Sequence, residues 1–380
     1  MSRPRTYLDW NATAPLRPEA RAAMLAALDV PGNPSSPHAE GRRARALIED
    51  AREQVAALVG AKPASVVFTS GGTEANNSVL AAGWETILLC GVEHDSVLTP
   101  ARASGARLVE IAVREDGVVD LDDLTRQVTQ IGAQNAGKRT LLSLQLANNE
   151  TGVLQPVADA ARLARERNLA SQTDAVQAAG RVAIDLSTLG VDYLTLSAHK
   201  LGGPKGVGAL IVREDASLPP FIRGGGQERR RRAGTENVAA IAGFGAAAAA
   251  AGSALAAMDA VRELRDALEA GVRELAPEAI VIAGGADRLP NTTSLALPGI
   301  SAETLVIALD LAGIAVSAGA ACSSGKVGAS HVLAAMGLAP KIASAAIRIS
   351  LGPSSTKRDV AAFIEAWGRV ALRQRERAVA

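Results

Sequence analysis

Short apolar runs rich in β-branched residues alternate along this chain with stretches of helical periodicity. Seven such runs between residues 66 and 212 predict strands, and most of the stretches between them carry apolar residues at helical spacing. Strands that alternate with helices are typical of a parallel sheet covered on both faces. The last run follows only a short turn, so we expect it to be the one antiparallel strand. The predicted strands are residues 66–69, 86–90, 107–113, 140–146, 169–173, 192–196 and 208–212.

Further elements flank this unit on both sides. Residues 40–59 predict a long amphipathic helix ended by Gly60, since glycine commonly follows the last helical residue. Residues 233–274 predict an alanine-rich, almost continuous helical stretch. Beyond it the pattern restarts, which indicates a smaller α+β unit. Its predicted strands are 279–283, 293–297, 314–317 and 347–350, and its predicted helices are 302–311 and 357–373.

The expected fold is therefore α/β, with a mostly parallel seven-stranded sheet, helices on both of its faces and a smaller α+β C-terminal domain. We expect a large domain over residues 14–254 and a small domain built from residues 1–13 and 255–380.

Composition narrows the class of protein. Lys and Arg number 40 and Asp and Glu 39, and this balance argues against a nucleic-acid partner, which would require a clustered basic excess. The longest apolar run, residues 244–251, is too short for a membrane span. The first residues contain no apolar signal segment. Two cysteines do not make a disulfide framework, so we expect a cytoplasmic protein.

Candidate chemistry begins where two predicted strands end. Ser197, His199 and Lys200 follow one of them, and Asp174 ends another. Ligands of parallel sheets bind beyond the carboxyl ends of the strands, where a lysine can act as an amine nucleophile. An aspartate nearby can keep a pyridinium nitrogen protonated, as pyridoxal phosphate (PLP) requires. Alone, Lys200 could equally be a surface residue, and Asp174 a helix cap.

A phosphate site is the third part that PLP requires. Gly71, Gly72 and Thr73 follow a predicted strand and open a helix. Glycines let backbone N–H groups approach an anion, and the N-terminus of a helix supplies positive potential. Taken alone, this segment could equally be the capped start of a helix. Together with Asp174 and Lys200, it favours PLP.

Further motifs share the order and spacing of one family. The chain resembles the cysteine desulfurases of the NifS/IscS type, which are class V aminotransferase-like, fold-type I PLP enzymes. The resemblance extends from Tyr7 to Gly352. The motifs that carry it are 71–74 (GGTE), 93–94 (EH), 148–152 (NNETG), Asp174, 197–200 (SAHK), 234–235 (GT) and 317–322 (SAGAAC).

The resemblance implies roles around the cofactor ring. Lys200 matches the lysine that binds PLP covalently, and Asp174 matches the partner of the pyridine nitrogen. Gln177 matches the donor to the ring oxygen. His94 matches the imidazole that stacks on the ring and can move protons. The residues that match the phosphate contacts are Gly72, Thr73, Ser197 and His199.

The same resemblance implies contacts to substrate and to a second subunit. Asn149 matches a residue near a PLP oxygen and the substrate carboxylate. Arg348 matches the arginine that binds this carboxylate, a task suited to a planar bidentate group. Thr235 matches a threonine that reaches the PLP phosphate of the other subunit, which implies a homodimer.

Cys322 is the residue that separates a desulfurase from a transaminase. The resemblance makes its thiolate the nucleophile that takes sulfur from L-cysteine as a persulfide, leaving L-alanine. A buried cysteine acting as a small hydrophobe is the alternative. About ten residues separate Cys322 from Val332, the longer form that the family uses as a flexible loop. We expect the other cysteine, Cys90, to be structural.

Persulfide sulfur needs an acceptor, such as an iron–sulfur scaffold protein. Only 32 residues follow Arg348, which is shorter than the tail that docks the scaffold in housekeeping members. A selenocysteine lyase or a cysteine sulfinate desulfinase would share the PLP residues without strict dependence on Cys322. A non-catalytic PLP-fold partner in sulfur transfer would be expected to lack Lys200 or Asp174. No histidine and cysteine grouping has the spacing of metal ligands.

Overall fold

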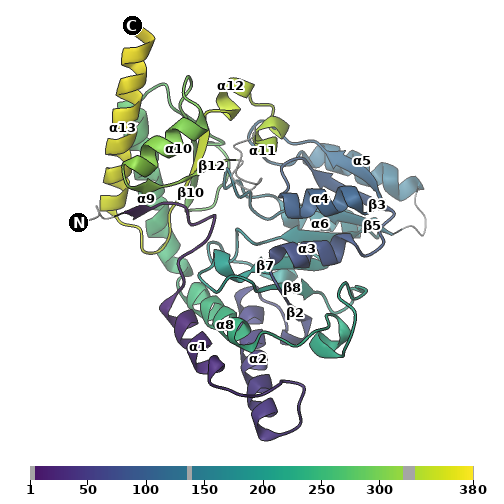
Figure 1. Ribbon diagram of the computed structural model, residues 1–380. Helices are drawn as coiled ribbons and strands as arrows, with labels where there is room; N and C mark the ends of the chain where they lie inside the picture. Colours follow the sequence, from purple (N-terminus) through teal and green to yellow (C-terminus); the bar gives the residue numbers. More distant parts are fainter. Residues whose placement is uncertain (1–4, 135–138, 320–329, 380) are drawn as a thin grey trace.

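The computed structural model describes residues 5–134, 139–319 and 330–379. Its largest element is a seven-stranded sheet with helices on both faces (Figure 1). Five neighbouring strands are parallel, and β8 is antiparallel to both of its neighbours, as the sequence predicts. In spatial order the strands are β2 (Val66–Thr69), β8 (Gly208–Val212), β7 (Tyr193–Ser197), β6 (Ala170–Asp174), β5 (Thr140–Ser143), β3 (Thr86–Cys90) and β4 (Arg107–Ile111).

Alternate side chains of these strands pack into two separate cores. Leu88 and Cys90 of β3 belong to the core on one face, whereas Ile87 and Leu89 belong to the core on the other. This follows from the two-residue period of a strand, and burial on both faces explains why the strands read as continuous apolar runs. The helices of the large unit are α1 (Pro18–Leu28), α2 (Ala39–Leu58), α3 (Gly72–Leu80), α4 (Asp95–Ala103), α5 (Leu121–Gln134), α6 (Val157–Arg165), α7 (Leu186–Leu189) and α8 (Val238–Ser253).

Short 3-10 helices occupy several turns of the chain. They are η1 (Pro63–Ser65), η2 (Ala198–Lys200), η3 (Gln227–Arg230) and η4 (Leu255–Ala257). The last of them breaks the helical stretch expected over 233–274. Helix begins only at Val238, where the side chain of Asn237 caps it, and the second half is the separate helix α9 (Met258–Leu275).

A smaller unit lies at the other end of the molecule, where Figure 1 also places both chain termini. It contains an antiparallel sheet in the order β12–β13–β10–β9 and a third core under α9, in which Phe363 stacks on Trp367. The proposed domain boundaries at 13/14 and 254/255 stay a prediction. The elements of this unit are β9 (Ile280–Ile282), β10 (Thr292–Ala296), α10 (Ala302–Leu311), β12 (Ser317–Ala318), α11 (His331–Ala335), α12 (Pro340–Ala343), β13 (Ala346–Ser350) and α13 (Lys357–Val379).

The single strand expected over 314–317 is instead two short strands in different sheets. β11 (Ile314–Ala315) pairs in parallel with β1 (Thr6–Tyr7), whereas β12 pairs antiparallel with β13. The pairing with β1 brings the start of the chain against its last quarter. Among the described residues, no single helix has the length and apolarity to cross a membrane; α8 and the stretch 255–275 pass that test only as a pair, bent by 57°.

Candidate active site

A cavity of about 250 Å³ lies at the carboxyl ends of β6 and β7, and β12 and β13 of the small unit close its other side. Ten of the twelve site residues predicted from the sequence line it, so the structure brings the proposed constellation together. They are Gly72, Thr73, His94, Asn149, Asp174, Gln177, Ser197, His199, Lys200 and Arg348. Of the other two, Thr235 is not among the lining residues, and Cys322 lies outside the described residues.

The start of α3 forms one end of this cavity. A Cβ atom added at Gly72 would lie 2.9 Å from Val176 Cγ2, so a larger residue would displace the segment after β6. A Cβ added at Gly208 would lie 2.8 Å from the Cα atom of Gly71, which requires glycine where the two backbones cross. The first N–H groups of a helix have no acceptor within the helix. Together with Ser197 beside them, they can bind a phosphate.

Asp174 is a buried carboxylate with a fixed orientation. One of its oxygens accepts the N–H of Val176 at 2.9 Å, and the other accepts the side-chain amide of Asn76 at 2.8 Å. Asn76 is held in turn, because its own oxygen accepts from Gln172 at 2.8 Å. The aspartate predicted as the partner of a ring nitrogen is therefore held rigidly at the edge of the cavity.

His94 is linked to the same network. Its Nδ1 atom accepts the N–H of Ser96 at 3.0 Å, which caps α4 and places the proton of the neutral imidazole on Nε2. The hydroxyl of Ser96 lies 2.8 Å from Nδ1 and also accepts from Asn76 at 2.9 Å. Asn76 thus bonds to Asp174 directly and is linked to His94 through the hydroxyl of Ser96.

Lys200 extends from η2 toward the start of the chain. Its Nζ donates to the carbonyls of Asn11 at 2.6 Å and Ala12 at 3.0 Å. Burial lowers the pKa of the adjacent His199 to about 4, with a further contribution from Lys200. The His199 imidazole is therefore neutral near pH 7, and its Nδ1 lies 3.1 Å from the hydroxyl of Thr13.

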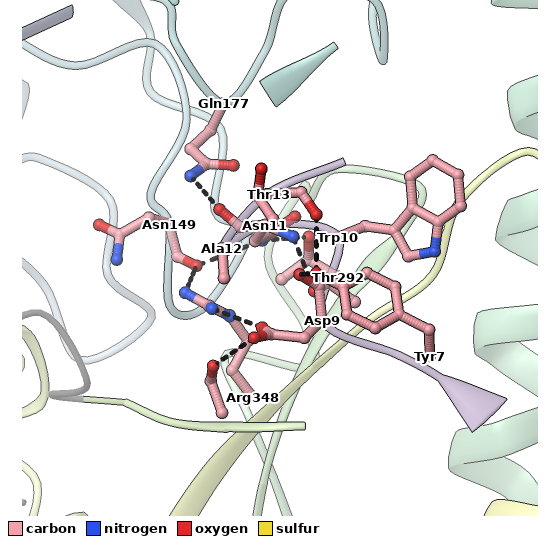
Figure 2. A network of polar contacts seen from close by, with 12 residues as sticks. Tyr7, Asp9, Trp10, Asn11, Ala12, Thr13, Asn149, Gln177, Thr292 and Arg348 are labelled. Carbon is pink, nitrogen blue, oxygen red and sulfur yellow. Dashed lines mark hydrogen bonds and ion pairs between the residues drawn. The ribbon is translucent and has the colours of Figure 1, made fainter. Parts of the chain in front are cut away.

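Arg348 forms the opposite side of the cavity (Figure 2). It donates to the carbonyl of Asn149 at 3.1 Å and to Asp9 Oδ1 at 2.8 Å, and the hydroxyl of Ser317 donates to Asp9 Oδ2 at 2.8 Å. Within the described residues, the buried Nε atom of Arg348 has no hydrogen-bond partner. A guanidinium has five N–H groups, so this one has donors left for a carboxylate in the cavity.

Asn11 is a site residue that the sequence interpretation missed. Its side-chain amide donates to the Asn149 carbonyl at 3.2 Å and to Thr292 at 3.0 Å, while its carbonyl accepts from Gln177 (Figure 2). The same carbonyl also accepts from Lys200. Asn11 therefore connects Lys200, Gln177 and Asn149, three of the residues predicted for the site. The segment around it was part of the family resemblance, but its residue types indicate no particular ligand chemistry.

Two buried glutamates lie close to the cavity. Burial, together with a smaller contribution from the charge of Asp174, raises the pKa of Glu93 to about 8. Glu93 Oε1 accepts the N–H of Gln145 at 2.7 Å. Burial also raises the pKa of Glu150, which accepts the hydroxyl of Ser330 at 2.6 Å. A Cβ atom added at Gly319 would lie 2.6 Å from Glu150 Oε2. Glu150 thus lies between the two described ends of the segment that contains Cys322.

The arginine-rich segment before Thr235 is partly internal. Glu228 is buried and forms a two-pronged ion pair with Arg52, with both N–O distances 2.8 Å, and Arg232 pairs with Glu74 at the start of α3. Thr235 itself is exposed. Of the cysteines, only Cys90 is described; it is buried in the core, in agreement with a structural role.

Comparison with known proteins agrees with this geometry. The family model for aminotransferase class V matches residues 6–363. Cysteine desulfurase IscS of Dictyoglomus turgidum is 38% identical over 96% of this chain and 94% of its own. The chain belongs to this family, among the cysteine desulfurases. The expected family and the expected enzyme class are therefore confirmed, and the lyase and desulfinase alternatives are not favoured.

Solved structures confirm the fold of this desulfurase. The NifS-like protein from Rickettsia africae superposes with a TM-score of 0.88 at 36% identity, covering 96% of this chain and 99% of that one. A structure described as SspA in complex with cysteine superposes with a TM-score of 0.77 at 28% identity, covering 92% of this chain and all of that one.

The family implies PLP as the cofactor, and the residues present fit it. A primary amine, Lys200, and a held carboxylate, Asp174, line one cavity. The helix start at Gly72, where an added Cβ atom would press on the side chain of Val176, provides the N–H groups that a phosphate needs. His199 at this end is neutral near pH 7, because burial lowers its pKa to about 4.

Proposed function

We propose that this protein removes sulfur from L-cysteine with PLP as its cofactor, forming L-alanine and a persulfide on Cys322. The observation that carries the proposal is the convergence of Lys200, Asp174 and Arg348 on one cavity in a cysteine desulfurase chain. The solved SspA complex with cysteine supports the choice of substrate.

The residues that would hold PLP are those that the family resemblance implies, and their positions around the cavity support these roles. Asp174 would accept the ring N–H and Gln177 would donate to the ring oxygen. His94 would lie against the ring. When bound, PLP supplies an electron sink for the carbon atom next to the amine. The phosphate would be bound by Gly72, Thr73, Ser197 and His199.

This chain's own groups position the substrate and move its protons. Arg348, held by Asp9 and the Asn149 carbonyl, binds the substrate carboxylate through its remaining N–H groups. Lys200 takes the proton from Cα and returns one later, while the carbonyls of Asn11 and Ala12 hold its ammonium form.

Sulfur transfer uses the thiolate of Cys322. It attacks the substrate sulfur, so that an S–S bond forms and the C–S bond breaks, with the electron pair going to the substrate carbon. That carbon takes a proton. The net change is that L-cysteine, the Cys322 thiolate and one proton give L-alanine and the protonated persulfide. Cys322 therefore separates this activity from transamination and from its lyase relatives.

Replacement of Cys322 tests this proposal. We expect Cys322→Ala to lose cysteine-dependent formation of alanine and sulfide, measured together with a reductant, while the visible absorbance of bound PLP stays. The matched control is Cys90→Ala, because Cys90 is the other cysteine and lies in the core. Undiminished alanine formation by Cys322→Ala would exclude Cys322 as the nucleophile.

We further propose a homodimer with two composite sites, in which Thr235 contacts the PLP phosphate of the other subunit. Its exposure and its absence from the cavity of its own chain support this arrangement. We expect Thr235→Ala to release PLP about ten-fold faster, since a hydrogen bond to a charged group contributes about 1.5–3 kcal/mol. A protein that sediments as a monomer and still holds PLP fully would contradict the composite site.

The sulfur acceptor is proposed to be a protein such as an iron–sulfur scaffold, because a relative carries the name IscS. Capture of proteins that receive labelled persulfide sulfur from Cys322 tests this. The cytoplasmic location expected from the sequence stays a prediction.

A further inference from the structure

Arg181 is a buried arginine behind the cavity that the mechanism above does not use. Only 7% of its surface is exposed. Its guanidinium donates to the carbonyl of Gln177 at 2.7 Å, to the side-chain oxygen of Gln177, and to the carbonyls of Trp10 at 3.3 Å and Lys200 at 3.4 Å. All of these acceptors are uncharged, and within the described part of the chain no carboxylate forms an ion pair with it.

This environment differs from that of Arg52, which is also buried. Arg52 forms its two-pronged ion pair with Glu228 and lies over the ring of Phe68. A buried cation without a carboxylate is costly, and burial lowers the pKa of Arg181 to about 9, helped by the charge of Arg348. Charge pairing therefore does not explain why Arg181 is buried here. Its hydrogen bonds to uncharged acceptors hold it in place.

The side-chain contact with Gln177 fixes which way that amide points. Arginine has only donors, so the atom of Gln177 that faces Arg181 must be the oxygen. The nitrogen of Gln177 then faces the cavity side, where it donates to the carbonyl of Asn11 at 3.1 Å (Figure 2). A flipped amide would place a donor against Arg181 and an acceptor against the Asn11 carbonyl, and would lose both bonds.

We propose that Arg181 is a positioning residue for the cofactor, which holds the Gln177 amide with its NH2 group toward the cavity and its oxygen away from it. One hydrogen of this NH2 group goes to Asn11, and the second is the donor for the ring oxygen of PLP. The inference rests on the proposed function, in which Gln177 contacts that oxygen.

A double-mutant cycle on the holoenzyme tests this coupling, with release of PLP during dialysis, followed by its visible absorbance, as the readout. We expect Gln177→Ala to weaken PLP binding about ten-fold in the wild-type background, because a donor to a charged oxygen is lost. In the Arg181→Met background the same substitution should add less than about two-fold, because the amide is no longer oriented. Equal effects of Gln177→Ala in both backgrounds would overturn the proposal.

Two further variants separate orientation from general damage. Arg181→Lys retains a donor toward Gln177, so the effect of Gln177→Ala should return in that background. The matched control is Arg265→Met, which removes another buried arginine that donates to a backbone carbonyl, here that of Leu289, outside the cavity. It should leave PLP binding and the effect of Gln177→Ala unchanged.

Gln177→Glu keeps the proposal testable if Arg181→Met does not fold. This change keeps an oxygen toward Arg181 and turns the donor toward the cavity into an acceptor, so PLP release should be faster than in Gln177→Ala. A Gln177→Glu protein that holds PLP as the wild type does would refute the proposed orientation. A wild-type protein that binds no PLP would instead refute the proposed function.

Discussion

The two sides of the cavity are built in different ways. The sheet wall, formed by Gly72, Asp174, Ser197 and Lys200, comes from the ends of neighbouring strands and the turns that follow them. The N-terminal wall consists of Asn11 and Arg348, which line the cavity, and of Asp9, which pairs with Arg348. It joins segments from opposite ends of the chain, since Asp9 and Arg348 lie 339 positions apart. Side chains, rather than strand pairing alone, hold the second wall together.

This difference predicts how each wall responds to substitution. Backbone hydrogen bonds between β6 and β7 position the sheet wall. A change of side chain there is therefore expected to remove one functional group and to leave the neighbouring residues in place. In the N-terminal wall, Asp9 holds Arg348, which is proposed to bind the substrate, and Asn11 holds Lys200. A change there is expected to displace its partners, and thus to alter substrate binding more than the chemical step.

Lys200→Ala gives the largest expected effect and tests the sheet wall. It removes the group that is proposed to move the Cα proton, and general acid–base catalysis alone is worth about 10²–10⁴-fold in rate. We expect cysteine turnover to fall by about 10⁴-fold, while the thermal midpoint of unfolding stays close to that of the wild type. Steady-state assays and a thermal melt measure the two effects, and a melt lowered together with activity would break the comparison.

Asp9→Ala tests the N-terminal wall and has an intermediate expected effect. Arg348 loses one of its two holding contacts, so KM for L-cysteine should rise about ten-fold, with kcat changed less than about two-fold. Asp9→Asn keeps an oxygen for Arg348 and should recover most of the loss. If Asn is as damaging as Ala, the charge of Asp9 matters rather than the orientation it imposes.

Glu93→Gln has the smallest expected effect on turnover at neutral pH and tests whether Glu93, near Asp174 of the sheet wall, is protonated in the folded protein. Burial raises the folded pKa of Glu93 to about 8 from an ordinary 4.5. The folded protein thus keeps a proton that the unfolded chain loses, and its free energy of unfolding falls as pH rises from 4.5 through 8.

Glu93→Gln removes this pH dependence. The free energy of unfolding of the wild type, measured relative to that of Glu93→Gln, should therefore fall by up to about 1.4 kcal/mol per pH unit in that window. Denaturant titrations at several pH values measure it. Turnover of the variant near pH 7 should stay within about two-fold of the wild type, since the neutral amide resembles the protonated acid. Parallel stability curves for the two proteins would show that Glu93 does not titrate in this range.

Much of the fold was predictable, because burial on both faces leaves a local pattern in the sequence. The seven strands of the large sheet and its antiparallel member, β8, follow from apolar runs and turn residues alone. The sequence did not predict the break between α8 and α9, nor the division of residues 314–318 between two sheets. Alanine-rich sequence continues through the break, and the partner of a two-residue strand depends on distant segments.

The sequence by itself determined the prediction for the strand ends, because the residue types and chain positions of Asp174, Lys200 and the glycines at the start of α3 together indicate a PLP site. The tertiary structure alone decided how those groups are held. The contacts of Asp9 with Arg348, of Asn11 with Lys200 and of Arg181 with Gln177 join segments or turns whose residues are ordinary by type. Periodicity reports the burial of a side chain, whereas the direction of a hydrogen bond exists only once both partners are in place.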